Sequence, residues 1–502
     1  MRLLWIDDEI DLLRPYVYAL REKGYAVETA TNGPDGLALL RTQDFDLVLL
    51  DQAMAGMQGL EVLRAIKETD SDVLVAMVTK SDDEALIDEA YGKLVDDFVI
   101  KPFTPAQLLA VLKRLLEKRT LVSRRITAEF VSAMGQPRTA DSWQEWVDWY
   151  RSLTRWQALL GRYGDGSLTG MLADRQRDAD GEFARYIERH YRDWLAGEGP
   201  VMSHNLLRQY VQPLWEEHQV YLLLLDSLRL DQWEALLPLL RDMYEIETTC
   251  YYSILPSATP YSRNAIFSGM LPLEIARRFP GYWVFEETGQ NRFEEQLLAE
   301  QLKRLRFSGR SLFLKVSHGD ELTGARQMLL DSHLRFAAVV VNFLDLLIHS
   351  VRGSRVLDEM IPDDAALVGS TRVWFASSPL YELLRTLANR NCRIVVTSDH
   401  GFIRVRRHTT IYGSREMSAN LRYKYGGAIR VDEREALLLH RPADFMLPTE
   451  HDTVKYALAR SDFYFIYPTR PREYEKTYKL TFQHGGVSLA EMIVPLAVLK
   501  PR

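Results

Sequence analysis

Short, continuously apolar segments that end in a polar residue recur along the first part of the chain. Between residues 1 and 118 these segments are LLWID, FDLVLLD, VLVAMVT and DFVIKP, and a stretch with helical spacing of apolar residues follows each of them. Segments that are apolar on both faces are typical of buried parallel strands, which are joined by crossover helices. The alternation therefore predicts an α/β fold with a doubly wound parallel sheet for residues 1–118.

The polar residues that end these segments predict a site at the carboxyl edge of the sheet, where such folds bind their ligands. They are Asp7, Asp8, Asp51, Thr79 and Lys101. Three carboxylates together with a backbone carbonyl make an oxygen site suited to Mg²⁺, and Asp51 can attack a phosphoryl donor as a nucleophile. Lys101 and the Thr79 hydroxyl are expected to hold the phosphoryl oxygens.

This set of residues, with the stretches DQAMAGMQGLE and KPF, resembles the response-regulator receiver family over residues 1–118. The resemblance implies that Asp51 accepts a phosphoryl group from a sensor histidine kinase. It also implies that Asp7, Asp8 and the carbonyl of Ala53 bind Mg²⁺ with Asp51, and that Phe98 is the switch aromatic.

Two positions depart from the receiver pattern. Ala55 follows Met54 where a proline is usual, and Phe98 stands where tyrosine is commoner. The missing proline affects the stiffness of the loop, and the phenylalanine affects the hydrogen bond that a switch tyrosine would make. Phosphorylation of Asp51 depends on neither.

Strand patterns are absent from residues 119–214. The stretches DSWQEWVDWYRSLTRWQALL and GEFARYIERHYRDWLAG instead carry aromatic residues at three- and four-residue spacing, which predicts a helical-bundle linker. The tryptophans at 143, 146, 149 and 156 fit either the core of the bundle or a stripe that binds a partner. No DNA-reading helix-turn-helix is recognisable, which disfavours a transcription-factor output.

Residues 215–502 contain two further apolar runs that end in potential metal ligands. VYLLLLD ends in Asp226, and RIVVTSDHG ends in Asp399 and His400. Each run reads as a buried parallel strand, so the three side chains are expected to emerge at the carboxyl edge of one sheet. We predict that they form one metal-binding group.

A second group is predicted from Asp345, His349 and His484. Asp345 and His349 are four residues apart in VVVNFLDLLIHS, a spacing that places both on one face of a helix, and His484 precedes two glycines in FQHGG. Mixed oxygen and imidazole ligands suit zinc when one coordination position stays open for substrate. The two groups together predict a site for two Zn²⁺ ions, with Mn²⁺ as the alternative ion.

The stretch YYSILPSATPYSRNAIFSGMLP supplies a candidate nucleophile. Thr259 lies after a predicted strand and just before a helical stretch, where a metal could lower the pKa of its hydroxyl. Arg263 and Asn264 lie within one turn of it and either contact the nonbridging oxygens of a substrate or hold the loop.

The order of these residues resembles the alkaline phosphatase superfamily. DSLRLD, SATPYSRNAIFSG and HGGVSLAEMIVP bring residues 215–500 closest to its PglZ branch. The joined architecture resembles the PorX family of response regulators, which is linked to type IX secretion. The resemblance implies that Thr259 attacks a phosphodiester, that one metal stabilises the leaving alkoxide and that the other activates water.

Composition limits the remaining choices. A formal net charge of -7 argues against a duplex-DNA-binding surface, and with only two cysteines the chain has no cysteine-rich zinc site. No signal peptide or membrane span is legible, so we expect a cytoplasmic protein. The basic clusters at 304–310 and 404–408 fit either solvated faces or attraction of phosphate-rich ligands.

Two hypotheses of different classes follow. In the first, the chain is a response regulator whose output domain is a dizinc phosphodiesterase for small nucleotide substrates. In the second, the output domain is chiefly a docking module, and phosphorylation of Asp51 changes homodimer formation or binding to secretion-machinery or transcription partners.

Overall fold

The computed structural model describes residues 1–43, 45–69, 73–80, 95–134, 140–163, 166–286, 289–351, 354–414, 417–469 and 471–502. They form two compact units, the first chiefly Met1–Ala133 and the second built from Met134 onward. Within these ranges, no helix is both long enough and apolar enough to cross a membrane.

The first unit is built on a five-stranded sheet in which all neighbouring strands are parallel. In the order β2-β1-β3-β4-β5 the strands are Ala26–Ala30, Arg2–Ile6, Leu47–Asp51, Leu74–Thr79 and Asp97–Ile100, and helices α1 (Arg14–Glu22), α2 (Gly33–Thr42), α3 (Gly59–Thr69) and α5 (Pro105–Met134) accompany them. Leu3 and Trp5 pack with α1 and α5, whereas Leu4 and Ile6 pack with α2 and α3. Alternate residues of one strand thus enter two cores, which confirms the predicted doubly wound sheet.

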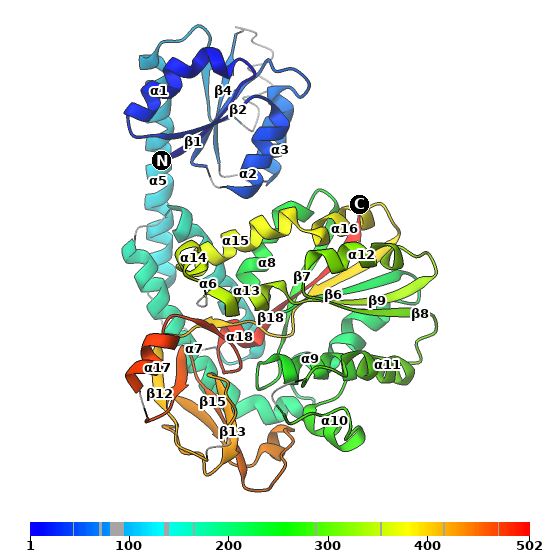
Figure 1. Cartoon of the computed structure of the whole chain (residues 1–502). Coiled ribbons are helices and arrows are strands. Elements are labelled where there is room, and N and C mark those ends of the chain that lie inside the picture. The colour runs from blue at the N-terminus through cyan, green and yellow to red at the C-terminus, as the bar shows by residue number, and fades with distance from the viewer. Residues whose placement is uncertain are drawn as a thin grey trace. The chain divides into compact units, whose positions relative to one another are not determined.

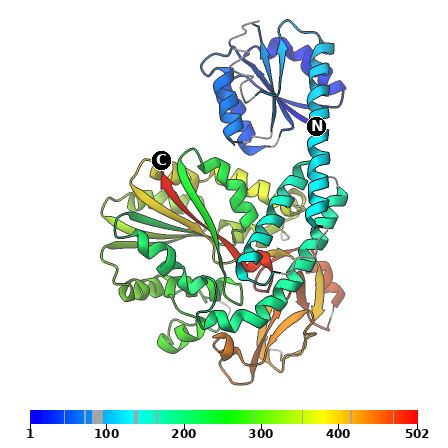
Figure 2. The ribbon, with the colours of Figure 1, turned by 180° about the vertical axis from the view of Figure 1, so that it is seen from behind.

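Two long helices, α6 (Trp143–Tyr163) and α7 (Gly166–Leu195), begin the second unit. Trp146 and Trp149 are buried, and the Trp146 ring packs edge-on against Phe183 of α7, as expected for tryptophans in a bundle core. Both helices contact α18 (Leu489–Met492), near the far end of the chain (Figure 2). The helical stretch predicted between the two α/β regions therefore packs on the second of them.

The second unit is centred on a six-stranded mixed sheet in the order β7-β18-β10-β6-β9-β8. These strands are Tyr244–Tyr252, Ile493–Pro501, Cys392–Thr397, Gln219–Leu225, Leu334–Val341 and Arg310–Val316. The pairs formed by β10, β6, β9 and β8 are parallel, and β18 runs antiparallel to both β10 and β7. The predicted larger α/β domain is confirmed, with two antiparallel pairs at one edge of its sheet.

Helices cover both faces of this sheet (Figure 1). One face carries α9 (Thr259–Ser268) and α11 (Glu294–Arg304), and the other carries α12 (Gly319–Leu329) and α16 (Pro379–Leu387). Further helices are α8 (Leu230–Leu240), α10 (Pro272–Arg278), α13 (Phe343–Ser350), α14 (Arg355–Met360), α15 (Asp364–Ser377) and α17 (Pro471–Tyr478). The strands β11 to β17, between Ile403 and Gln483, form separate small sheets.

Candidate functional site

The first unit gathers its predicted residues at the carboxyl ends of β1, β3 and β4. Lys101 Nζ lies 2.7 Å from Asp7 Oδ2 and 2.8 Å from Asp51 Oδ1, and the backbone N–H of Ala53 donates to Asp51 Oδ2 at 3.1 Å. Carboxylate oxygens of Asp7, Asp8 and Asp51 all lie within 4.8 Å of one another. This arrangement fits a hard cation such as Mg²⁺ beside an aspartate nucleophile.

Electrostatics at Asp51 follow from its position in the sheet. Burial raises the pKa of Asp51, and the hydrogen bond from Lys101 opposes that rise. Thr79, at the end of β4, is buried, while Phe98 on β5 is only partly buried against the core. The structure thus brings Thr79 and Lys101 to the edge that carries Asp51.

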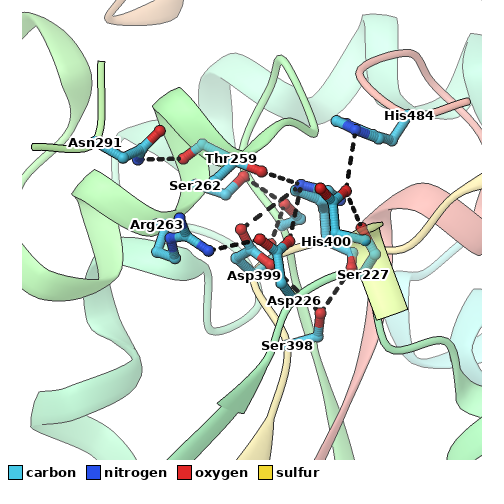
Figure 3. Close-up of polar contacts among 12 residues, drawn as sticks. Asp226, Ser227, Thr259, Ser262, Arg263, Asn291, Ser398, Asp399, His400 and His484 are labelled. Atoms are coloured by element: carbon cyan, nitrogen blue, oxygen red, sulfur yellow. Dashed lines mark hydrogen bonds and ion pairs between the residues drawn. The ribbon is translucent and has the colours of Figure 1, made fainter. Parts of the chain in front are cut away.

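In the second unit, the two strand ends deliver three side chains to one place. Asp226 directly follows β6, and Asp399 and His400 follow β10, its parallel neighbour. His400 Nε2 lies 3.6 Å from Asp399 Oδ2 and 3.9 Å from Asp226 Oδ1 (Figure 3). Thr259, the first residue of α9, places its Oγ1 3.0 Å from His400 Nε2. The hydroxyl therefore points at this group.

The second predicted group also comes together. Asp345 Oδ1 lies 3.3 Å from His349 Nε2, one turn along α13, and 3.6 Å from His484 Nε2, which follows β17 (Phe482–Gln483). The two imidazole Nε2 atoms are 3.1 Å apart. The side chain of His349 is 45% exposed, so the group opens to solvent on that side.

Two contacts join the groups. The rings of His400 and His484 stack with centroids 4.3 Å apart and an interplanar angle of 18°. Ser227, next to Asp226, has a left-handed φ of 65° and donates a hydrogen bond from its hydroxyl to Asp345 Oδ1 at 3.0 Å. A non-glycine residue in this conformation is strained. In this conformation the Ser227 hydroxyl, next to the first group, points at Asp345 of the second group.

The donor atoms of these groups fit metal ions on their own chemistry. In each group the three ligand atoms lie within 4.8 Å of one another. Oδ1 of Asp226 and Oδ2 of Asp399 are buried and have no hydrogen-bond partner in the part of the chain that the structure describes. Leaving two such oxygens buried is costly unless a cation binds them. Mixed carboxylate and imidazole donors accept zinc or manganese.

The pKa shifts of the site residues also fit bound metal ions. Burial raises the pKa of Asp226 well above its ordinary range, and the nearby carboxylate of Asp399 adds to that rise. Burial, with the neighbouring His400, lowers the pKa of His484 well below its ordinary value. A neutral imidazole is the form that binds a metal, whereas two close carboxylates need a cation to stay ionised.

Arg263 and Asn264 contact the protein's own groups. Arg263 is buried; its Nη1 donates to Asp226 Oδ2 at 2.6 Å, and its Nε bonds to Glu294. Asn264 Nδ2 donates to the carbonyls of Pro260 and residue 290 at 2.9 and 3.1 Å. Contact of either residue with the nonbridging oxygens of a substrate, and the alternative that they hold the loop, both stay predictions. The sequence analysis did not predict a role for Glu294, because no local sequence pattern identifies a residue of α11 as the partner of Arg263.

A cavity of about 670 Å³ opens beside the second group. The lining residues are Ala258, Pro260, Gln290, Ile348, His349, Ala419, Asn420, Leu421, Tyr423, Thr477, Tyr478, Thr481, Gln483 and His484. Among these described lining residues there is no lysine, arginine, aspartate or glutamate. A ligand that enters here meets aromatic, amide and hydroxyl groups next to the two histidines.

Three family models match the chain in succession. Residues 3–113 match the response regulator receiver domain, residues 119–195 the PorX response regulator linker domain, and residues 206–499 the BREX system PglZ alkaline phosphatase-like domain. The last match covers more than half of the 502 residues. The chain belongs to the PglZ family. It is a response regulator with a PorX-type linker and a PglZ output domain, and such a receiver implies a sensor kinase as partner.

Relatives with curated descriptions match the receiver part. The transcriptional regulatory protein ResD of Bacillus subtilis is 32% identical over 122 residues, 24% of this chain and 50% of ResD. The alginate biosynthesis transcriptional regulatory protein AlgB of Pseudomonas aeruginosa is 36% identical over 124 residues, 24% of this chain and 27% of AlgB. The chain thus spans half or less of the length of these relatives.

Among solved structures, the response regulator TrrA of Thermotoga maritima, in complex with Mg²⁺ and BeF, is 31% identical. The match covers 23% of this chain and 97% of TrrA, with a TM-score of 0.21.

Proposed function

We propose that this response regulator is a metal-dependent phosphodiesterase that acts on small nucleotide substrates. The observation that carries the proposal is the contact of Thr259 with the first of two adjoining ligand groups. In that group, buried carboxylate oxygens of Asp226 and Asp399 have no hydrogen-bond partner among the described residues. Zinc fits the mixed donors best, and manganese is the alternative.

The chain's own residues divide the reaction between them. Thr259 Oγ1 attacks phosphorus and forms an O–P bond as the bond to the leaving alkoxide breaks, and the alkoxide takes up the proton that the hydroxyl loses. The resulting threonyl diester keeps the other substituent of the substrate; water then breaks the bond between phosphorus and Thr259 Oγ1, which releases a phosphomonoester and restores the hydroxyl. Two divalent cations, when bound, lower the pKa of the attacking hydroxyl and neutralise charge on the phosphoryl group. Arg263 bonds to Asp226 Oδ2 and lowers the pKa of that carboxyl against the larger rise caused by burial.

The described lining of the adjoining cavity has no lysine or arginine, which supports a diester substrate over a monoester. A diester carries one negative charge at phosphorus and a monoester close to two at neutral pH. Tyr423, Tyr478 and Asn420 offer aromatic and amide surfaces that suit a nucleobase or ribose. A charged sugar phosphate would find no lysine or arginine among the described residues of this lining.

We extend the proposal to regulation. Phosphorylation of Asp51 by a sensor histidine kinase is proposed to promote a homodimer, and the PorX-type linker supports a role in the control of type IX secretion. Binding to secretion-machinery or transcription partners would serve that role.

The deciding experiment compares hydrolysis of bis(p-nitrophenyl) phosphate and p-nitrophenyl phosphate by the wild type and Thr259→Ala, with metal content measured by mass spectrometry. We expect two bound ions, preference for the diester, and a loss of at least about a thousandfold in kcat for the variant with metal retained. Thr323→Ala, at an exposed position of α12, is the matched control. A metal-free, inactive wild type would leave only the docking module, and unchanged hydrolysis in Thr259→Ala would remove the nucleophile.

A further inference from the structure

Helix α7 of the bundle makes polar contacts with loops that flank the candidate metal site. Asp180 Oδ1 accepts a hydrogen bond from the backbone N–H of Leu489 at 2.8 Å, and the Tyr191 hydroxyl accepts one from the N–H of Leu255 at 2.8 Å. Both side chains are fully buried, with exposures of 1% each. The two contacts lie on one helix, eleven residues apart.

The Asp180 contact leads to both histidine-bearing turns. Leu489 begins the short helix α18, in which Glu491 is completely buried. Glu491 Oε1 accepts from the N–H of Gly486 at 2.9 Å, and the Glu491 carbonyl accepts from the N–H of Gly401 at 3.0 Å. Gly486 lies two residues after His484, and Gly401 directly follows His400. One turn of helix thus holds the backbone beside a ligand of each group.

The Tyr191 contact leads to the nucleophile. Leu255 lies in the loop between β7 and Thr259, four residues before the threonine. In the same loop the Ser257 hydroxyl donates to the carbonyl of Gly486 at 2.7 Å. The nucleophile loop and the His484 turn are therefore tied to each other, and α7 holds each of them at a separate point.

Burial of Asp180 favours a role for its hydrogen bond over simple packing. Burial raises the pKa of Asp180 to about 7, although the Leu489 N–H opposes the rise, and Glu491 and Asp462 are nearby acids that add to it. An apolar side chain of similar size would fill this position at lower cost, since a buried acid loses its hydration. What an apolar residue cannot supply is an acceptor for the first N–H of α18.

We propose that Asp180 and Tyr191 are positioning residues, through which helix α7 sets the placement of the nucleophile loop and of the two histidine-bearing turns. The bundle is then a working part of the metal site and not a passive connector. Groups that orient metal ligands from outside the coordination sphere commonly change metal affinity or activity ten- to a hundredfold when they are removed. The turnover part of this inference rests on the proposed phosphodiesterase, whereas the metal-affinity part does not.

The test uses the full chain and compares Asp180→Ala with Asp180→Asn and Asp178→Ala. Affinity for zinc is measured by competition with a chromogenic chelator, and kcat and KM with bis(p-nitrophenyl) phosphate. We expect Asp180→Ala to bind zinc at least about tenfold more weakly. Asp180→Asn keeps a carbonyl acceptor and should stay within about threefold of the wild type. The exposed Asp178 on the same helix should have no effect.

A second pair separates positioning from folding. Tyr191→Phe removes only the hydroxyl, and we expect kcat to fall about tenfold with KM and zinc affinity unchanged, because its contact lies on the nucleophile loop. Tyr186→Phe, on the same helix but with its ring packed near Trp146, is the control. If Asp180→Ala does not fold, Tyr191→Phe decides.

Wild-type affinity and wild-type kcat in both Asp180→Ala and Tyr191→Phe would overturn the inference. A wild type that binds zinc but hydrolyses no diester would instead overturn the proposed function, and the zinc affinities of the Asp180 pair would still decide the inference.

Discussion

The receiver site and the output-domain site both gather three or more carboxylates, but they balance the negative charge differently. In the receiver, the Lys101 ammonium lies within 2.8 Å of both Asp7 and Asp51. In the output domain, Arg263 reaches only one oxygen of Asp226, and the facing oxygens of Asp226 and Asp399 are buried without a hydrogen-bond partner in the described ranges. The receiver lysine pairs with two carboxylates, whereas in the output domain we propose that bound metal ions neutralise the oxygens that Arg263 does not reach.

This difference separates the receiver site from the proposed metal site of the output domain. A carboxylate that is already partly neutralised can rest without a metal and take up Mg²⁺ and a phosphoryl group transiently. Buried oxygens that lack a partner make the metal part of the stability of the domain, since binding to the folded state alone stabilises it. We therefore expect loosely held Mg²⁺ in the receiver and retained ions in the PglZ domain.

The sharpest way to break the comparison is a crossed pair of isosteric variants. Asp51→Asn should abolish phosphoryl uptake from acetyl phosphate and leave the metal content of the output domain unchanged. Asp399→Asn should lower diester hydrolysis by at least about a thousandfold and reduce bound zinc, because it removes an otherwise unpartnered ligand oxygen. Phosphate incorporation and metal content are measured on both proteins. Loss of both functions in either variant would show that the sites are not separable.

Metal affinity measured over a series of pH values compares the two sites through single ligands, His349 in the output domain and Asp51 in the receiver. Burial lowers the pKa of His349, but the hydrogen bond and charge of Asp345 outweigh that effect, so the net pKa lies above its ordinary 6.5. Burial raises the pKa of Asp51 above its ordinary 3.8. Protons compete with metals for deprotonated ligands, so affinity falls as the pH falls through each pKa. The output domain should therefore lose zinc affinity about tenfold per pH unit once the pH is below the pKa of His349.

The receiver should lose its Mg²⁺ affinity as the pH falls through the raised pKa of Asp51, where the carboxylate takes up a proton. Titration of each metal at fixed ionic strength measures both profiles. A zinc affinity that stays constant between pH 8 and pH 5 would contradict the assignment of His349 as a ligand.

The sequence predicts some residues of the two sites and not others, for a physical reason. Strand ends are marked by apolar runs, so the convergence of Asp226 with Asp399 follows from the pairing of β6 and β10. The helical spacing of Asp345 and His349 is equally local. The left-handed Ser227, the Arg263–Glu294 pair and the contact of Asp180 with Leu489 join positions far apart in the chain or depend on backbone torsions. No periodic pattern in the sequence predicts such contacts, so only the three-dimensional structure identifies them.

The smallest expected effect concerns assembly. Beryllofluoride at Asp51 imitates a phosphoryl group and competes for Lys101, which now bonds to Asp7 and Asp51. Redirecting that ammonium biases the receiver between two surface states, and we expect about a twofold rise in mass by sedimentation, the step from monomer to dimer. Zinc added at the output site should not change the mass, because its ligands are already gathered in place. Asp51→Asn is the control for the first arm; an unchanged mass of the wild type with the mimic would mean that charge at Asp51 acts within one chain.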